Sequence, residues 1–255
     1  MRNVFLIIVL LSAYCLYGQS AVDIVKSSRD RIKSDTVQSR STMILTSKNG
    51  SKSERTINQY SKDGPNGSRT IVEFLTPASV KGTRFLTTQN KDGGDDRWIY
   101  LPELNRVRRI AAQEGGKSFV GTDLSYDDIS STDRDVDKDT HKILREETLN
   151  GSACYVVESE PKDKSYQYGR MVSWIDKNNY VNHKLELYDR KGALIKRYEI
   201  LELNEVQGRL SPWVSKMTSL NANTSTTVNI LQLVYDKALP DSMFTTNYLE
   251  TGKAN

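Results

Sequence analysis

Residues 141–160 read HKILREETL-NG-SACYVVESE, and this stretch decides the fold class. Two runs, His141–Leu149 and Ser152–Glu160, flank the dipeptide Asn150-Gly151. Asn-Gly favours the positive-φ turn that joins two antiparallel strands, because both residues tolerate that backbone conformation. The stretch therefore predicts a β-hairpin and, with it, an antiparallel sheet.

The same pattern recurs on both sides of this hairpin. Further strands are expected at short intervals across residues 39–110 and 141–234, joined by turns such as the one at Asn49-Gly50. In residues 69–76, Val72 and Phe74 alternate with polar or opposite-facing neighbours, as they do in a strand. Connections of hairpin length predict a mainly β protein, an antiparallel meander or barrel of about eleven strands.

One helix is expected before the first strand. Ser20 and Asp23 form a start that resembles a capping box, and Val22, Val25 and Ile32 recur at helical spacing. The spacing predicts an amphipathic helix of three to four turns with one apolar face on the rest of the protein.

The first 20 residues have the features of a secretory signal. Arg2 precedes an uncharged apolar run over residues 4–11, and Gly18-Gln19-Ser20 supplies small residues for cleavage. The run is too short to cross a bilayer as a helix. We expect one mature domain, residues 21–255, outside the cytoplasm. A second interpretation makes Cys15 the acylated cysteine of a lipoprotein signal, although bulky Tyr14 precedes it.

The composition excludes several classes of protein. Removing Arg2 leaves 35 basic and 32 acidic residues, a net charge of +3, which is too balanced for a dedicated nucleic-acid binder. His141 and His183 lie far apart, so we expect neither a metal site nor a cofactor. After cleavage Cys154 is the single cysteine, and we expect it in the core as a small apolar side chain.

No catalytic motif is evident, and we expect no enzymatic activity. Nucleophile elbows and phosphate-binding loops are absent from the sequence. Acidic pairs such as Asp95/Asp96 and Asp127/Asp128 are adjacent residues, and adjacent residues of a strand point to opposite faces. Two carboxylates that cleave one glycosidic bond must instead converge on it.

Residues 111–139 interrupt the regular strands. This segment contains Gly115, Gly116 and Gly121 and lacks clear alternation. A loop of this length within a domain is usually functional or disordered. The apolar side chains of Phe119, Tyr126 and others indicate that it packs back on the sheet, and a short helix is expected at residues 126–130.

Two groups of side chains have both a functional and a purely structural interpretation. Arg106, Arg108 and Arg109 form the densest basic cluster, which either binds an anionic surface or pairs with Asp95, Asp96 and Glu103. The strand aromatics either fill an ordinary core or line a hollow that a curved sheet leaves open. Pattern alone does not separate a filled interior from an open one.

Three tracts together resemble a known family. They are Asp96-Arg97-Trp98-Ile99-Tyr100-Leu101-Pro102, Arg106-Val107-Arg108-Arg109-Ile110 and Ser118-Phe119-Val120-Gly121-Thr122-Asp123-Leu124-Ser125-Tyr126-Asp127-Asp128. They resemble the outer-membrane lipoprotein-sorting (LolA-like) family of bacterial envelope proteins, and the resemblance extends over nearly the whole mature chain. It implies a strongly curved antiparallel sheet, an incomplete barrel like LolA and LolB, with a helical lid over an apolar cavity.

The resemblance implies a periplasmic carrier that binds the acyl chains of lipoproteins or lipids. We expect the lid and the lipid cavity to be formed by Val22, Val25, Ile32, Met43, Leu45, Phe74, Phe85, Trp98 and Trp174. Phe119 and Tyr126 would gate its mouth, with the three glycines of the loop as hinges. The alternative is a non-enzymatic envelope sensor or accessory protein that binds a membrane protein, such as an inner-membrane transporter or exporter.

Overall fold

The computed structural model describes residues 19–65, 67–90, 94–130 and 134–254. Most of the expected signal segment, including Cys15, lies outside the described residues. The description therefore begins with Gln19 and Ser20, directly before the first helix.

Within the described residues thirteen strands form one sheet, whereas the sequence predicted about eleven. They are β1 (Thr36–Thr46), β2 (Lys52–Lys62), β3 (Arg69–Thr76), β4 (Arg84–Thr88), β5 (Asp96–Leu101), β6 (Arg106–Arg109), β7 (Asp139–Leu149), β8 (Ser152–Pro161), β9 (Arg170–Asp176), β10 (Asn182–Tyr188), β11 (Leu194–Val206), β12 (Arg209–Ser219) and β13 (Thr224–Tyr235). The hairpin expected at residues 141–160 is β7–β8, and Asn150 and Gly151 both have positive φ, at 49° and 87°.

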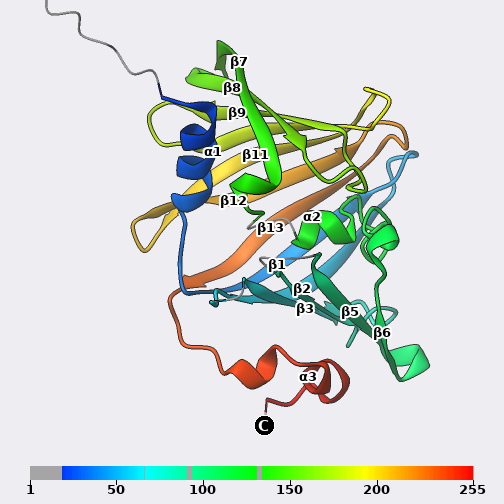
Figure 1. Cartoon of the computed structure of the whole chain (residues 1–255). Coiled ribbons are helices and arrows are strands. Elements are labelled where there is room, and N and C mark those ends of the chain that lie inside the picture. The colour runs from blue at the N-terminus through cyan, green and yellow to red at the C-terminus, as the bar shows by residue number, and fades with distance from the viewer. Residues whose placement is uncertain (1–18, 66, 91–93, 131–133, 255) are drawn as a thin grey trace, which may run out of the picture.

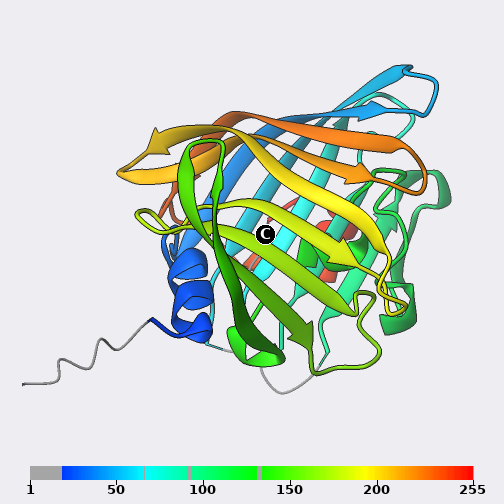
Figure 2. The same ribbon diagram turned by 90° about the horizontal axis from the view of Figure 1, so that it is seen from above.

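The sheet is an antiparallel meander whose first and last strands, β1 and β13, pair at its centre. Its order is β6-β5-β4-β3-β2-β1-β13-β12-β11-β10-β9-β8-β7, so β1 and β13 are the one neighbouring pair that is not consecutive in the chain. The sheet curves into an open half-barrel with β6 and β7 at its two edges (Figures 1 and 2). The predicted fold class, a curved antiparallel sheet that does not close, is confirmed.

Alternation along the strands produces two apolar faces on the β1–β6 half of the sheet. Met43, Ile57, Val72, Phe74 and Phe85 pack in one cluster on the concave face. Side chains of the opposite parity, including Ile71 and Leu86, pack in a second cluster on the convex face. Both faces of this half are therefore buried, and each needs a covering segment that is not part of the sheet.

The expected first helix is α1 (Ala21–Asp30). The hydroxyl of Ser20 accepts a hydrogen bond from the Asp23 amide at 3.1 Å and so caps the helix. Ile24 is fully buried against Val157 of β8 and Ile175 of β9. The helix thus covers the concave side of the β7–β9 half and ends two residues before Ile32.

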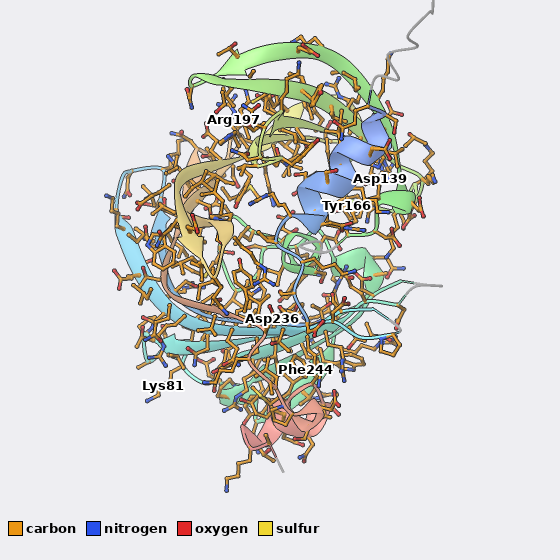
Figure 3. The ribbon with its side chains drawn as sticks, turned by 90° about the vertical axis from the view of Figure 1, so that its left-hand side faces the viewer. Lys81, Asp139, Tyr166, Arg197, Asp236 and Phe244 are labelled. Carbon is orange, nitrogen blue, oxygen red and sulfur yellow. The ribbon has the colours of Figure 1, made fainter. Side chains whose placement is uncertain are left out.

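The convex face of the other half is covered by the C-terminal segment, residues 239–251, which the sequence analysis did not predict. It contains the short helix α3 (Thr246–Thr251), which the hydroxyl of Thr245 caps at 3.1 Å and which Gly252 ends with φ 67°. Leu249 is fully buried there. Figure 3 shows Phe244 on this side of the sheet and Tyr166 on the opposite side, near α1.

The long connection between β6 and β7 follows from the strand order. Because these two strands are consecutive in the chain but lie at opposite edges, the residues between them must cross the open side of the half-barrel. This connection carries α2 (Tyr126–Ser130), the short helix that the sequence predicted. It also carries the 3-10 turn η4 (Val136–Lys138) before β7. Topology therefore places this segment over the concave face (Figure 1).

Candidate functional site

The concave face of β1–β5 provides an apolar floor. Its side chains belong to five neighbouring strands and share one face because they occupy register-matched positions, as Val72 and Phe85 do. We call this set the floor: Met43, Ile57, Val72, Phe74, Phe85 and Ile99. Each of them is buried. A concave surface made of apolar side chains is suited to bind an apolar ligand.

The chain itself covers this floor. We call residues 111–130 the plug. Phe119 is fully buried, and its ring centroid lies 5.6 Å from that of Phe74 and 5.2 Å from that of Phe85. The Tyr126 ring lies 5.4 Å from Phe85 and 5.8 Å from Phe119. These four rings form one aromatic cluster, which supplies both area burial and edge-to-face contacts.

Phe119 and Tyr126, which we expected at the mouth as a gate, therefore lie inside the hollow. The expected open interior is filled on this side by the protein's own side chains. Their positions follow from the crossing connection, because a segment that spans the concave side can bury its aromatic residues only against the floor.

Polar contacts hold the plug to strands in both halves of the sheet. The carboxylate of Asp123 accepts hydrogen bonds from the hydroxyls of Thr224 and, at 2.8 Å, Thr226 of β13. Asp128 pairs with Lys196 of β11 at 2.9 Å and accepts a bond from the Tyr168 hydroxyl at 2.8 Å. Both strands belong to the half of the sheet that lies beyond β1.

In the other half of the sheet, β2 and β5 also bind the plug. The Arg55 guanidinium of β2 donates to the Val120 carbonyl. Arg97 of β5 is 8% exposed and pairs with Asp127 at 2.8 Å and with Asp95 at 3.2 Å. Burial raises the pKa of Asp127, and the nearby carboxylates of Asp128 and Asp95 add to this against the attraction of Arg97.

The tip of the plug has an unusual backbone. Val120 adopts φ 49° and Gly121 φ 76°. Positive φ suits glycine, but it is a genuine outlier for a β-branched residue and costs on the order of 1–3 kcal/mol. Gly115 is needed for another reason, since a Cβ atom there would collide with the Asp127 carboxylate.

The remaining concave face lies between α1 and the plug. Leu187 and Met217 are buried there with Tyr168, and Met171, Leu185 and Tyr198 pack against them with partial exposure. Burial raises the pKa of the Tyr198 hydroxyl, which lies near Ser215 and Arg31. This part of the concave face therefore carries apolar side chains as well, beside polar ones such as Lys196 of β11.

The other expected lid and cavity residues are divided between several locations. Leu45 packs on the floor cluster and Val25 on the α1 cluster, whereas Val22 is 43% exposed and Ile32 lies beyond the helix end. Trp98 packs with the convex cluster under α3, and Trp174 packs with Cys154, Val156 and Val172. Both tryptophans have the opposite parity to the concave residues Ile99 and Ile175, so they do not face the floor.

The basic cluster of β6 is largely paired. Arg108 contacts Glu114 at 2.8 Å and Arg109 contacts Asp96. Glu114 also accepts from Lys117 and from the Ala111 amide, and these bonds, that of Lys117 first, lower its pKa to about 2. Arg106 is exposed and has no acidic partner among the described residues. Structural pairing therefore explains two of the three arginines.

A polar pocket lies beside α2. It has a volume of about 340 Å³. We define the polar pocket by its lining residues: Gln89, Gly94, Asp95, Arg97, Ala112, Asp127, Ser130, Arg134, Lys138, Lys162, Asp163, Ser165 and Tyr166. The sequence analysis did not bring these residues together, because they come from the β4–β5 turn, α2, η4 and the segment after β8.

The polar pocket does contain two converging carboxylates, Asp95 and Asp127. Both point at the Arg97 guanidinium rather than at open space, and Ser130 also accepts from Arg97 at 2.9 Å. The described residues hold no group of three or more His, Cys, Asp or Glu side chains placed to bind a metal ion. None of the described helices has the length and hydropathy of a membrane span.

Comparisons with known proteins agree with this architecture. A family model described only as "Uncharacterized protein" matches residues 66–251. No curated protein matches the chain by sequence. A DUF1329 family protein from Desulfovibrio piger is similar, with 29% identity, a TM-score of 0.86, and coverage of 90% of this chain and 97% of that chain. The LolA superfamily protein NE2245 from Nitrosomonas europaea shares the fold, with 21% identity, a TM-score of 0.75, and coverage of 91% and 100%.

One further solved structure carries the family assignment. It is an outer membrane lipoprotein-sorting protein domain from Vibrio parahaemolyticus, with 30% identity and a TM-score of 0.85. The match covers 90% of this chain and 98% of that domain. Together with the family model and the half-barrel, this places the protein in the outer membrane lipoprotein-sorting (LolA-like) family.

Proposed function

We propose that the protein is a periplasmic, non-enzymatic carrier that binds acyl chains of lipoproteins or lipids on its concave face. The mature domain would be residues 21–255. The observation that carries this proposal is the floor, an apolar face that extends over β1–β5 and is covered by the plug, a connection outside the sheet, and not by another strand. The similar Vibrio domain is described as lipoprotein-sorting, which supports the same class of cargo.

Because Phe119 and Tyr126 occupy the hollow, binding would be an exchange. The plug would leave the floor and the hydrocarbon chain would take its place. Burying each aromatic side chain contributes roughly 1.5–3 kcal/mol, whereas an acyl chain gains about 0.8 kcal/mol per methylene, so about eight methylenes are enough to outweigh both rings. The polar contacts of Asp123 and Asp128 then set how readily the plug leaves.

This exchange predicts that weakening one of those contacts accelerates uptake. Asp123→Ala removes two hydroxyl bonds to β13 and leaves the floor unchanged. We expect uptake of a fluorescent fatty acid to be at least about tenfold faster, since each hydrogen bond to a charged group contributes about 1.5–3 kcal/mol. Stopped-flow fluorescence on the purified mature protein measures it.

The matched control is Asp35→Ala, which removes an exposed carboxylate before β1, away from the plug. It should leave uptake unchanged. Native mass spectrometry of protein purified from cell envelopes provides an independent measurement. If no acyl species is bound and neither wild type nor Asp123→Ala takes up the fatty acid, the carrier proposal is wrong.

The filled hollow favours one second candidate. A protein that keeps its plug permanently in place would need no cargo and would act as an envelope sensor or accessory protein with a membrane partner such as an exporter. Crosslinking in intact envelopes distinguishes the two. A protein complex that persists after lipid is stripped, together with absent uptake, supports the accessory role.

A further inference from the structure

A row of hydroxyl side chains crosses the concave face beside the floor. We call Ser61, Thr70 and Thr87 the hydroxyl row, because the register pairs them across β2, β3 and β4. The register then pairs Thr87 with Arg97 of β5. Residues two positions apart in a strand share one face, so Thr87 lies on the same face as Phe85 of the floor, about 7 Å further along β4. The apolar floor therefore has a polar border on this side.

The hydroxyl of Thr87 is buried without a partner. Thr87 is 2% exposed, and its Oγ1 atom makes no hydrogen bond with any of the described residues. The other two hydroxyls of the row differ from it, since Ser61 and Thr70 bind each other at 2.8 Å. A buried polar group that lacks a partner costs free energy, which points to a partner that the chain itself does not supply.

Arg97, at the end of the row, is bound mainly by the plug. Its Nη2 atom lies 2.8 Å from Asp127 and 3.2 Å from Asp95, and its Nε donates to the Ser130 hydroxyl at 2.9 Å. Asp127 and Ser130 belong to α2 and hence to the plug, whereas Asp95 directly precedes β5. Release of the plug would therefore remove two of these three contacts from the guanidinium.

The charges around Arg97 balance only while the plug is seated. Asp95 also has the Lys138 ammonium within 3.6 Å, so the two cations Arg97 and Lys138 face the two carboxylates Asp95 and Asp127. Departure of Asp127 would leave one positive charge in excess beside a buried guanidinium. A buried charge without a counterion is costly. An incoming anionic group would restore the balance.

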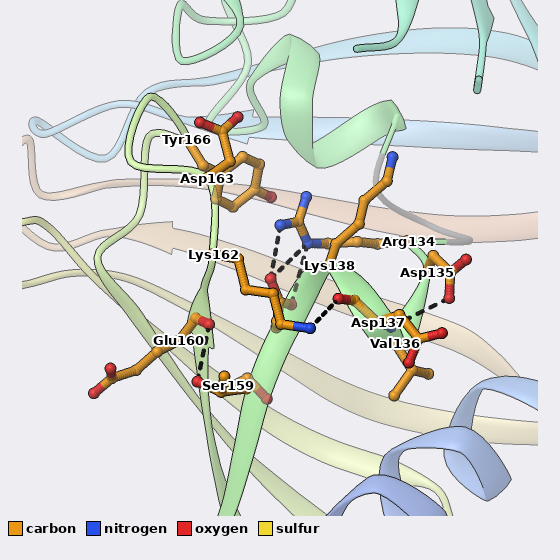
Figure 4. A network of polar contacts seen from close by, with 12 residues as sticks. Arg134, Asp135, Val136, Asp137, Lys138, Ser159, Glu160, Lys162, Asp163 and Tyr166 are labelled. Atoms are coloured by element: carbon orange, nitrogen blue, oxygen red, sulfur yellow. Dashed lines mark hydrogen bonds and ion pairs between the residues drawn. The ribbon is translucent and has the colours of Figure 1, made fainter. Parts of the chain in front are cut away.

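The other basic side chains of the polar pocket are engaged outside the plug. Arg134 donates to the Asp139 carboxylate at 2.7 Å, and the Lys162 ammonium donates to the Asp137 carbonyl at 2.6 Å (Figure 4). These contacts do not depend on the plug, because both acceptors follow it in the chain. Among the described basic residues of the polar pocket, Arg97 is thus the one whose partners change when the plug leaves.

The seated plug has the chemistry of an anionic amphiphile, with aromatic rings on the floor and the Asp127 carboxylate on Arg97. We infer that Arg97 and Thr87 bind the anionic group of an amphiphile whose hydrocarbon chain replaces those rings. The guanidinium supplies the charge and the Thr87 hydroxyl a second donor, and the oxygens of one carboxylate or phosphate can accept from both. This inference rests on the proposed carrier function and names the class of its cargo.

The test compares three probes by isothermal titration calorimetry at pH 7: decanoate, decan-1-ol with a chain of equal length but no charge, and acetate with the charge but no chain. The wild type should bind decanoate about tenfold more tightly than decan-1-ol, as charge-assisted contacts predict, and acetate only weakly. In Thr87→Val the affinity for decanoate should fall about tenfold and that for decan-1-ol should stay within about twofold. Tm should not fall, because the hydroxyl has no partner in the chain to lose.

The matched control is Thr227→Val in β13. Its neighbour Thr226 binds Asp123 of the plug on the concave side, so Thr227 points to the opposite face. This variant should keep both affinities and Tm.

The possible outcomes separate the headgroup site from the carrier function. If both amphiphiles bind and the ratio of their affinities is about one, or does not change in Thr87→Val, the headgroup site is wrong while the carrier function stands. If neither amphiphile binds, the carrier function fails and this inference fails with it. If acetate binds as tightly as decanoate and decan-1-ol does not bind, the site takes a free anion and the hydrocarbon chain contributes nothing.

Discussion

Val120 carries a backbone conformation that the rest of the plug imposes on it. Its carbonyl is bound by Arg55, its preceding residue is the fully buried Phe119, and its own φ is 49°. A β-branched residue reaches this conformation only when its surroundings determine it. We expect the seated plug to hold this conformation, so that release of the plug would also release the strain.

This strain predicts different rates of fatty-acid uptake for two variants of Val120. Val120→Gly and Val120→Ala both lose the valine side chain, but only glycine adopts positive φ without cost. The seated plug should be more stable in Val120→Gly than in Val120→Ala by about 1 kcal/mol. Fatty-acid uptake should therefore be roughly fivefold slower in Val120→Gly than in Val120→Ala. Equal rates in stopped-flow fluorescence would show that the backbone of Val120 does not control the plug.

At the scale of elements, the C-terminal segment is attached to the sheet by both apolar and ionic contacts. Leu249 and Phe244 pack on the convex cluster, and Asp241 contacts Arg69 at 2.6 Å and Lys62 at 3.1 Å. Hydrogen bonds from Arg69 and then Lys62 lower the pKa of Asp241 below its ordinary value of 3.8. A carboxyl group whose pKa is lowered in the folded state stabilises the folded state at pH values above its ordinary pKa. This contribution is lost as the pH falls through the lowered pKa.

We therefore expect Asp241→Asn to lower Tm at pH 7 by about 1–2 °C, the small effect typical of an exposed ion pair. The difference from wild type should narrow as the pH falls below 3.8, where the wild-type carboxyl also loses its charge. Differential scanning calorimetry at pH 7 and at a pH below 3.8 measures this difference in Tm. A difference that is constant with pH would mean that the substitution acts through packing and not through charge. Asp35→Asn is the control and should change neither value.

At the scale of the whole molecule, the sheet and the plug are stabilised in different ways. The strands form one continuous ladder from β6 to β7, which does not depend on the plug for its hydrogen bonds. The plug's backbone bonds are mostly internal, as between the Phe119 amide and the Leu124 carbonyl at 2.7 Å. Segments of this kind open locally while the rest of a protein stays folded.

Native-state hydrogen exchange should detect this difference. Amides of residues 117–127 should exchange at least about tenfold faster than those of β1, β2 and β13, because they require only local opening of the plug and not unfolding of the sheet. A saturating fatty acid should accelerate exchange in the plug and leave these strands unchanged or slower. If plug amides exchange only with global unfolding, the plug is part of the permanent core and the proposed exchange with cargo cannot occur.

Local signals in the sequence predicted helix starts and turns correctly where a backbone conformation requires a particular type of residue. Asn150-Gly151 specified the β7–β8 hairpin, and Ser20 with Asp23 specified the start of α1. The C-terminal segment was missed although Thr245 and Gly252 provide cap signals, because α3 is short and its apolar residues follow no strand period.

The sequence by itself determined an antiparallel, mainly β chain with one leading helix and one irregular segment, because turns, caps and alternation act over a few residues. Only the tertiary structure decided which face of each strand is concave. Alternation separates Trp98 from Ile99 but does not say which of them meets the plug; the register of β4 with β5 and the curvature of the whole sheet decide that. Likewise, only the separation of β6 and β7 to opposite edges brings Phe119 onto the floor.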